Sequence, residues 1–220
     1  STGETTDHED EDSGNVYIEG GTLNVTADAT ATKCIKSDGS ITVSDGAITL
    51  NAKGAIDTSD TSDLSYAAGF KADGDFTQTG GDITINVTGA SGRGIGVDGT
   101  FTTTESSTGN LTITNSGALT SSGSTYFATA KGVKAGVVAI NGGTINVTMS
   151  GQASKAIKSD EDDGSGNMTI TGGTITINNS GAGGYDGTDK DAKGAGCLKA
   201  DKNMTISGGT LTLKATGTGG

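Results

Sequence analysis

The chain has 220 residues, 39 of them Gly, and contains neither Pro nor Trp. Only 31% of the residues are hydrophobic, which excludes a thick globular core and favours a thin core built from small layers. The formal net charge of -12 argues against nucleic acid as a partner, and no apolar stretch approaches the roughly 20 residues of a transmembrane helix.

The chain begins with an acidic segment that contains its single histidine, His8. One histidine gives no basis for a Ser-His-Asp or Cys-His nucleophile or for a histidine-rich zinc site. The stretch from Asp10 to Val16 resembles Glu161–Met168, which lies between two predicted strands, so we predict residues 7–15 to be a corner loop rather than a disordered tail. No basic and apolar leader opens the chain, and we expect any signal peptide to lie upstream.

Seven segments follow in which a Gly pair separates two short strands. Apolar residues alternate with Thr, Ser or Asn in each segment, as in a strand with one buried face. The first segment is Val16–Val25, and the others are taken to start at Ile41, Phe76, Leu111, Val138, Met168 and Met204. In two segments the first Gly of the pair is replaced, by Asp45 and by Ser116, and the second positions are Gly21, Gly46, Gly81, Gly117, Gly143, Gly173 and Gly209. Their spacing of roughly 25 to 36 residues is typical of solenoids.

A third strand of the form apolar-Lys-Ser/Ala-Asp, such as Ile157–Asp160, follows six of these segments. The sequence therefore predicts an all-β fold, a single right-handed parallel β-helix of about seven turns with three short strands per turn. Residues 1–220 would form one domain. The interior is expected to contain the column Leu23, Ile48, Ile83, Leu119, Ile145, Ile175 and Leu211.

The corners before the third strands alternate between short and long. The long ones lie near residues 51–68, 121–131 and 179–195, and insertions on one edge of a solenoid commonly mark its binding face. They contain Tyr66, Tyr126 and Tyr185, whose rings are suited to stacking on sugars. They also contain spaced carboxylates, which suggest Ca²⁺ because no histidine or thiol accompanies them. These are Asp57, Asp60, Asp63, Asp186, Asp189 and Asp191, and solvated acidic loops are the alternative interpretation.

Strand alternation points the lysines of the third strands outward, in a column of Lys36, Lys71, Lys134, Lys158 and Lys199. Beside it runs a column of Asp38, Asp73, Asp98, Asp160 and Asp201. Two interpretations stay open: opposite charges that support each other structurally, or a surface that binds ligand. Arg93, the sole arginine, could bind a carboxylate, although Lys33, Lys131 and Lys155 occupy the same column.

The sequence resembles a known family in its Gly-Gly-Thr strands, such as Gly172–Ile177, and in its Lys-Ser-Asp strands, such as Ile157–Asp160. The family is that of the bacterial carbohydrate-binding β-helix proteins, typified by a clostridial cellulose- and acidic-sugar-binding protein. Its members are similar in architecture to polysaccharide lyases. The resemblance covers nearly the whole chain. It implies a secreted or cell-surface protein that binds polysaccharide and Ca²⁺, and we expect a monomer. It adds metal candidates at Asp10, Asp12, Asp38, Asp73, Asp160, Asp162, Asp163 and Asp201.

The expected function is non-catalytic binding of acidic or plant cell-wall glycans, with the lysines or Ca²⁺ neutralising sugar carboxylates. One alternative is a calcium-dependent polyuronate (pectate) lyase with a column lysine as base. The regular columns count against it, because their only breaks, Gly96 and Gly136, remove functional groups. A second alternative is a structural stalk or an adhesin repeat.

Overall fold

The computed structural model describes residues 14–219. Every regular element in this range is a β-strand, and the range contains no helix that could cross a membrane. The predicted all-β class is therefore confirmed. The predicted corner loop at residues 7–15 lies outside the described residues, apart from its last two positions, and so do Asp10 and Asp12.

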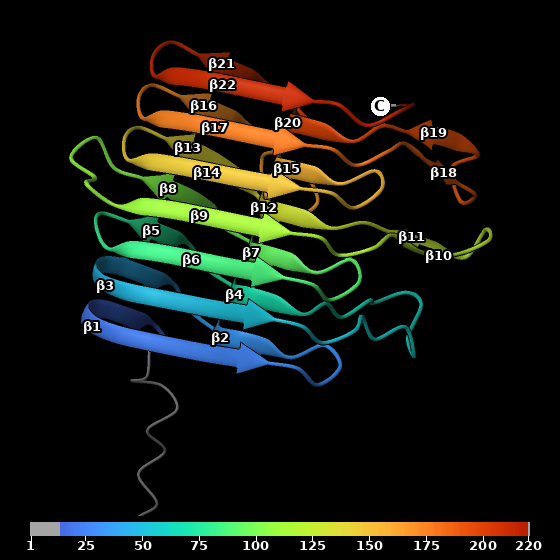
Figure 1. The fold of residues 1–220 in the computed structure, drawn as a ribbon, viewed down its shortest axis with the longest axis horizontal. Coiled ribbons are helices and arrows are strands. Elements are labelled where there is room, and N and C mark those ends of the chain that lie inside the picture. Colours follow the sequence, from blue (N-terminus) through green and yellow to red (C-terminus); the bar gives the residue numbers. More distant parts are fainter. Residues whose placement is uncertain (1–13, 220) are drawn as a thin grey trace, which may run out of the picture.

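Parallel strands stack in register on three faces (Figure 1). The first face contains the opening parts of β1 (Val16–Ala27) and β3 (Ile41–Ala52), then β5 (Phe76–Gln78), β8 (Thr100–Thr103), β13 (Val137–Ile140), β16 (Met168–Ile170) and β21 (Met204–Ile206). The second contains the closing parts of β1 and β3, then β6 (Asp82–Val87), β9 (Asn110–Asn115), β14 (Thr144–Met149), β17 (Thr174–Asn179) and β22 (Thr210–Ala215).

The third face is a separate sheet. It contains β2 (Lys33–Ser37), β4 (Ala68–Ala72), β7 (Arg93–Val97), β12 (Lys131–Ala135), β15 (Lys155–Ser159) and β20 (Gly196–Ala200). We number the layers along the stack: β1 and β2 are the first, β3 and β4 the second, β5 to β7 the third, β8, β9 and β12 the fourth, β13 to β15 the fifth, β16, β17 and β20 the sixth, and β21 and β22 the seventh.

Glycine turns the corner between the first and second faces. Gly46 has φ 109°, and a Cβ atom there would lie 3.1 Å from the backbone of the layer below. A side chain would therefore be strained by its φ and crowded by its neighbour. Positive φ recurs at the equivalent Gly21, Gly81, Gly143, Gly173 and Gly209.

The predicted start of the fourth repeat is wrong. Phe101 pairs with Phe76, and Leu111 pairs with Ile83, so Leu111 occupies the interior position that was assigned to Leu119. The corner between β8 and β9 ends in a single glycine, Gly109, and the alignment took another single glycine, Gly117, in its place. The correction lengthens the fourth-layer corner, so that Ile113 to Lys134 spans as many residues as Leu50 to Lys71. Long corners now recur in every second layer, and the sixth-layer corner, from Ile177 to Lys199, is one residue longer than the other two.

The core is a column of small clusters, one for each layer. Leu111, Ile113 and Phe101 are fully buried, and burying such a side chain stabilises the fold by about 1.5–3 kcal/mol. The Phe76 ring lies 5.2 Å from Phe70 and 5.7 Å from Phe101, measured between centroids. The layers therefore share an aromatic stack that holds the second to fourth of them together.

Buried asparagines fix the backbone where two long corners leave the stack. The Asn115 side-chain amide donates to the carbonyls of Gly92 (3.0 Å) and Lys131 (2.9 Å) and accepts from the Gly117 amide (2.9 Å). Asn179 makes the equivalent bonds two layers further on. Each asparagine thereby fixes the start of a neighbouring third-face strand.

Candidate functional site

The long corners of the second, fourth and sixth layers project from the same edge, at the right of Figure 1. The first is closed by the bridge between Asp57 and Ser65. The others are the antiparallel hairpins β10 (Thr120–Ser122) with β11 (Tyr126–Ala128), and β18 (Gly184–Asp186) with β19 (Asp191–Lys193). The intervening layers turn with short corners, so that recesses form between the projections.

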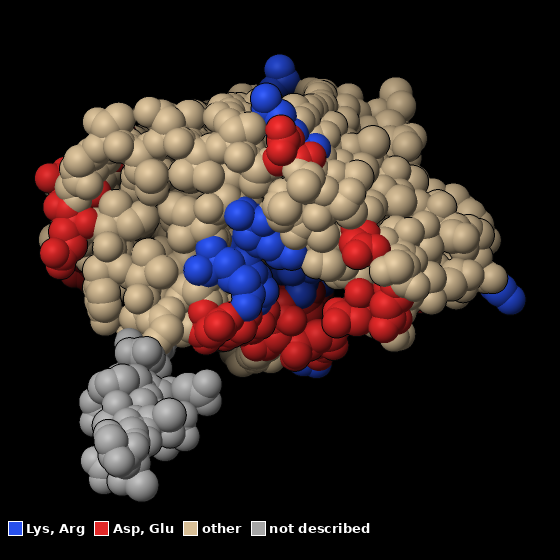
Figure 2. Space-filling view, turned by 90° about the horizontal axis from the view of Figure 1, so that it is seen from below, with Lys and Arg blue, Asp and Glu red and all other residues tan. Residues whose placement is uncertain are grey.

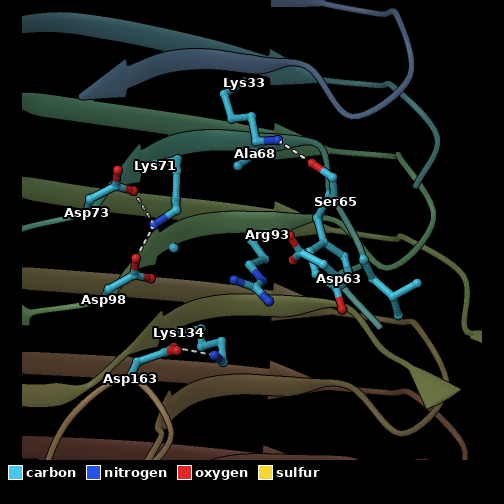
Figure 3. Close-up of a pocket in the computed structure, with 13 residues that line it drawn as sticks. Lys33, Asp63, Ser65, Ala68, Lys71, Asp73, Arg93, Asp98, Lys134 and Asp163 are labelled. Atoms are coloured by element: carbon cyan, nitrogen blue, oxygen red, sulfur yellow. Dashed lines mark hydrogen bonds and ion pairs between the residues drawn. The ribbon is translucent and has the colours of Figure 1, made fainter. Parts of the chain in front are cut away.

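Two clefts lie along this edge. The first cleft, of about 340 Å³, is lined among others by Lys33, Tyr66, Arg93, Gly96 and Lys134 (Figure 3). The second cleft, of about 460 Å³, is lined among others by Phe127, Lys131, Lys155, Lys158 and Asp186. The two are related by a step of two layers, because Arg93 and Lys155 occupy one column on the third face.

The predicted lysine column is paired with carboxylates. Lys71 Nζ lies 2.9 Å from Asp73 and 2.7 Å from Asp98, which belongs to the next layer. Lys158 likewise bridges Asp160 (2.5 Å) and Asp201 (3.1 Å). The remaining pairs join Lys36 to Asp38, Lys134 to Asp160 and Asp163, and Lys199 to Asp201. Basic and acidic side chains adjoin in the same way on the face that Figure 2 shows.

Asp160 is the most enclosed carboxylate of this ladder, with 6% of its side chain exposed. Burial alone would raise its pKa, but Lys158 and Lys134 outweigh burial and hold the pKa of Asp160 well below its usual range. Burial also opposes ionisation of Asp201, yet Lys199 and Lys158 lower its pKa. Both carboxylates are therefore ionised at neutral pH and neutralise the lysines beside them.

A second column of cations on the third face lacks such partners. It consists of Lys33, Arg93, Lys131 and Lys155, and we call it the unpaired basic column. None of them forms an ion pair with a carboxylate of residues 14–219. Arg93 instead lies over the Tyr66 ring, with its guanidinium carbon 4.2 Å from the ring centroid.

The three lysines of this column donate to uncharged oxygens. Lys33 Nζ donates to Ala31 O (2.7 Å) and Ser65 Oγ (2.8 Å), Lys131 Nζ to Thr129 O (2.8 Å), and Lys155 Nζ to Gly194 O. Burial lowers the pKa of Lys131 far below its usual range, and repulsion from Arg93 adds to this effect. Burial and repulsion also lower the pKa of Lys33 and Lys155. Arg93, Lys33 and Lys155 thus place positive charge on this edge without a paired carboxylate among residues 14–219, whereas burial most strongly disfavours the charged form of Lys131.

Sequence reasoning singled out Arg93 in this column but missed the three lysines as ligand-binding residues. A signal was present, because Lys36, Lys71, Lys158 and Lys199 are each followed two positions later by Asp, whereas Lys33, Lys131 and Lys155 are not. The lysines of the charge ladder and those of the unpaired basic column are spaced alike along the sequence. The fold is needed to show that only the ladder lysines lie within ion-pair distance of carboxylates.

Of the three predicted tyrosines, only Tyr66 lines a cleft. Tyr185 is 66% exposed on its hairpin, and Tyr126 lies on β11 outside both clefts. The aromatic ring that lines the second cleft is Phe127. The long corners therefore do not present three equivalent rings to one ligand.

The structure separates the predicted metal ligands. Within residues 14–219, no three His, Cys, Asp or Glu side chains gather closely enough to hold an ion. Asp38, Asp73, Asp160, Asp163 and Asp201 accept lysine ammonium groups, so their oxygens do not fit a calcium shell in this arrangement.

The remaining metal candidates are also engaged within their own loops. Asp57, Asp60 and Asp186 each accept the amide of the residue two positions ahead, while Asp189 and Asp191 pair with Lys193. The amide of Asp162 donates to the Asp160 carboxylate, which holds this residue at the start of its loop.

Fold and site together define an all-β repeat protein with parallel strands, a self-neutralised charge ladder and a cleft-lined edge. The sequence matches the family model described as carbohydrate-binding domain-containing protein twice, over residues 3–117 and 105–219. The two matches cover nearly the whole chain, and the protein belongs to this family. Searches of curated proteins and of solved structures gave no match. The carbohydrate-binding character of the predicted family is therefore confirmed, and the match supports a polysaccharide as partner.

Proposed function

We propose that the protein binds acidic polysaccharide, such as the uronate polymers of plant cell walls, without catalysing a reaction. The observation that carries this proposal is the unpaired basic column along the cleft-lined edge. A protein of net charge -12 would repel a polyanion unless its contact surface were locally positive. Arg93, Lys33 and Lys155, which have no carboxylate partner within residues 14–219, supply that surface, while the ladder beside them is self-neutralised.

The function is tested by affinity electrophoresis of the purified protein in gels that contain polygalacturonate or a neutral glucan. We expect retardation by polygalacturonate that weakens as salt is added. Absence of retardation on every plant or microbial glycan would contradict the proposal and favour a structural stalk or adhesin repeat. Formation of unsaturated uronides, seen as ultraviolet absorbance, would instead show a lyase.

Calcium support is a second part of the proposal. Since the described carboxylates do not surround an ion by themselves, calcium would be held jointly by the protein and by sugar carboxylates. Asp63 lines the first cleft and forms no ion pair with a described lysine or arginine, so it is the protein ligand that we propose. Titration calorimetry of chelator-stripped protein should give calcium heat only with polyuronate present, and no heat in either case would remove the metal.

We further propose that the stacked layers are turns of one right-handed parallel β-helix over residues 1–220, with about seven turns of three short strands. The parallel register on all three faces supports a continuous coil, and right-handed crossovers prevail in parallel sheets.

The proposed ligand is met outside the cell, so we place the protein there or at the cell surface, as a monomer. Light scattering tests the monomer, and an experimental structure tests the handedness.

A further inference from the structure

The third layer differs from its neighbours at one position of the lysine column. Every other layer of the third face has Lys there, whereas the third layer has Gly96. A Cβ atom at Gly96 would lie 3.0 Å from Arg93 Cδ and 3.6 Å from its Nη1 atom. The arginine side chain therefore lies over the space that a lysine takes in the other layers.

Arg93 is held in this position without being neutralised. Its guanidinium lies against Tyr66, which restricts its rotamers while leaving the planar N–H groups without a carboxylate among residues 14–219. The nearby acids are engaged elsewhere, because Asp98 pairs with Lys71 and Asp163 pairs with Lys134. Figure 3 shows Arg93 between these two ion pairs, with Asp63 on the opposite side.

The second cleft lacks this arrangement although it is built from equivalent strands. Lys158 stands where the first cleft has Gly96, and it is tied to Asp160 and Asp201. Lys155, the counterpart of Arg93, donates to a backbone carbonyl. The combination of a restrained guanidinium with a glycine beneath its side chain thus belongs to the first cleft.

The geometry points to Arg93, Tyr66 and Gly96 as the subsite that recognises one carboxylate of the acidic glycan, an inference that rests on the proposed function. The guanidinium donates two N–H groups to the sugar carboxylate, which is the pairing that its planar fork favours. The missing side chain at Gly96 allows Arg93 to lie across the third layer, where its guanidinium lines the first cleft beside Tyr66. Specificity for a uronate over a neutral sugar then resides in the third layer.

The discriminating experiment is Gly96→Lys, measured as affinity for short galacturonate oligomers. The substitution gives the third layer the residue that the other layers carry, so the fold should tolerate it, and Arg93 can move aside because its Cδ lies on a flexible chain. It also adds one positive charge. We expect affinity to fall by about tenfold or more because the new side chain displaces the Arg93 guanidinium from its place against Tyr66. Non-specific attraction predicts tighter binding instead, and that result would overturn the inference.

Two further variants complete the test. Arg93→Lys keeps the charge, and the column already holds lysine in neighbouring layers, but the fork is lost, so we expect weakening by about tenfold. Lys36→Ala removes one exposed, ion-paired lysine that does not line the first cleft and should leave oligomer affinity within about twofold. If the unaltered protein binds no glycan, the proposed function itself fails. If it binds and neither Gly96→Lys nor Arg93→Lys weakens it, only the subsite is wrong.

Discussion

Asp160 is the residue on which the charge ladder of the upper layers converges, since both Lys134 and Lys158 contact it. Its side chain is 6% exposed, and those of the two lysines are 13% and 15% exposed. Removing one partner from an enclosed cluster leaves charge without compensation, which costs more than an exposed ion pair contributes.

We therefore predict that Asp160→Asn lowers the free energy of unfolding by about 2 kcal/mol, as measured by urea denaturation. The asparagine oxygen still accepts one hydrogen bond, which keeps the loss moderate. The matched control is Asp38→Asn, whose side chain is 77% exposed and which should change stability by less than about 1 kcal/mol. Equal losses in the two variants would show that enclosure does not set the strength of the ladder.

The same carboxylates predict acid sensitivity. The pKa values of Asp160 and Asp201 are lowered in the folded chain, while unfolded Asp titrates near about 3.9. The unfolded state therefore binds more protons as the pH falls. The ladder's contribution is complete above about pH 4 to 5 and is lost below it. Urea midpoints measured from neutral to acidic pH should fall more steeply for the wild type than for Asp160→Asn, and parallel curves would contradict this assignment.

Among the elements, the strands whose corners carry a Gly pair could be predicted from sequence. Alternation and the Gly pairs correctly identified the interior residues of every layer but the fourth. There, β8 and β9 are joined by a corner with the single Gly109, and Gly117, which was aligned instead, belongs to the corner that leads to the third face. Alternation alone could not resolve the shift, since Leu111 and Leu119 both lie in alternating stretches. Only pairing with the adjacent layers fixes the register.

The corrected register makes an element-scale prediction. Leu111→Ala should destabilise the protein by about 2–5 kcal/mol in urea denaturation, because Leu111 is fully buried against the layers on both sides. Leu119→Ala is the control, since this side chain is partly exposed near the projecting hairpins and should cost clearly less. A larger effect at Leu119 would favour the repeat alignment that the structure replaces.

At the scale of the whole molecule, the unit of organisation is two layers rather than one, a short-cornered layer followed by a long-cornered one. The alternation could be predicted from corner lengths, and the projecting edge follows from it. The clefts could not be predicted from the sequence. They depend on which column of cations pairs with the carboxylates and on how the Arg93 side chain lies across Gly96. Stacked layers are about 4.8 Å apart, so the two clefts repeat at about 9.6 Å along the edge.

Because the layers form the stack and the long corners project from it, we predict that the stack provides stability and that the long corners provide binding. Deleting residues 120–129 removes the β10–β11 hairpin and shortens the fourth-layer corner to the length that the third and fifth layers already use. We expect the unfolding free energy to change by only about 1 kcal/mol, because corner length contributes little to closure. Galacturonate oligomers should bind as before, since no residue of this hairpin lines the first cleft. Long polymer should bind more weakly, because the second cleft loses Phe127 and Thr129.

The matched deletion removes residues 57–65 from the second-layer corner and takes away the wall that holds Tyr66 against Arg93. Oligomer binding should then be lost while cooperative unfolding in urea persists. The two deletions act on equivalent corners of one repeated unit, so unequal effects on oligomer binding can arise only from the difference between the clefts. If both deletions weaken oligomer binding equally, the ligand is held by the edge as a whole.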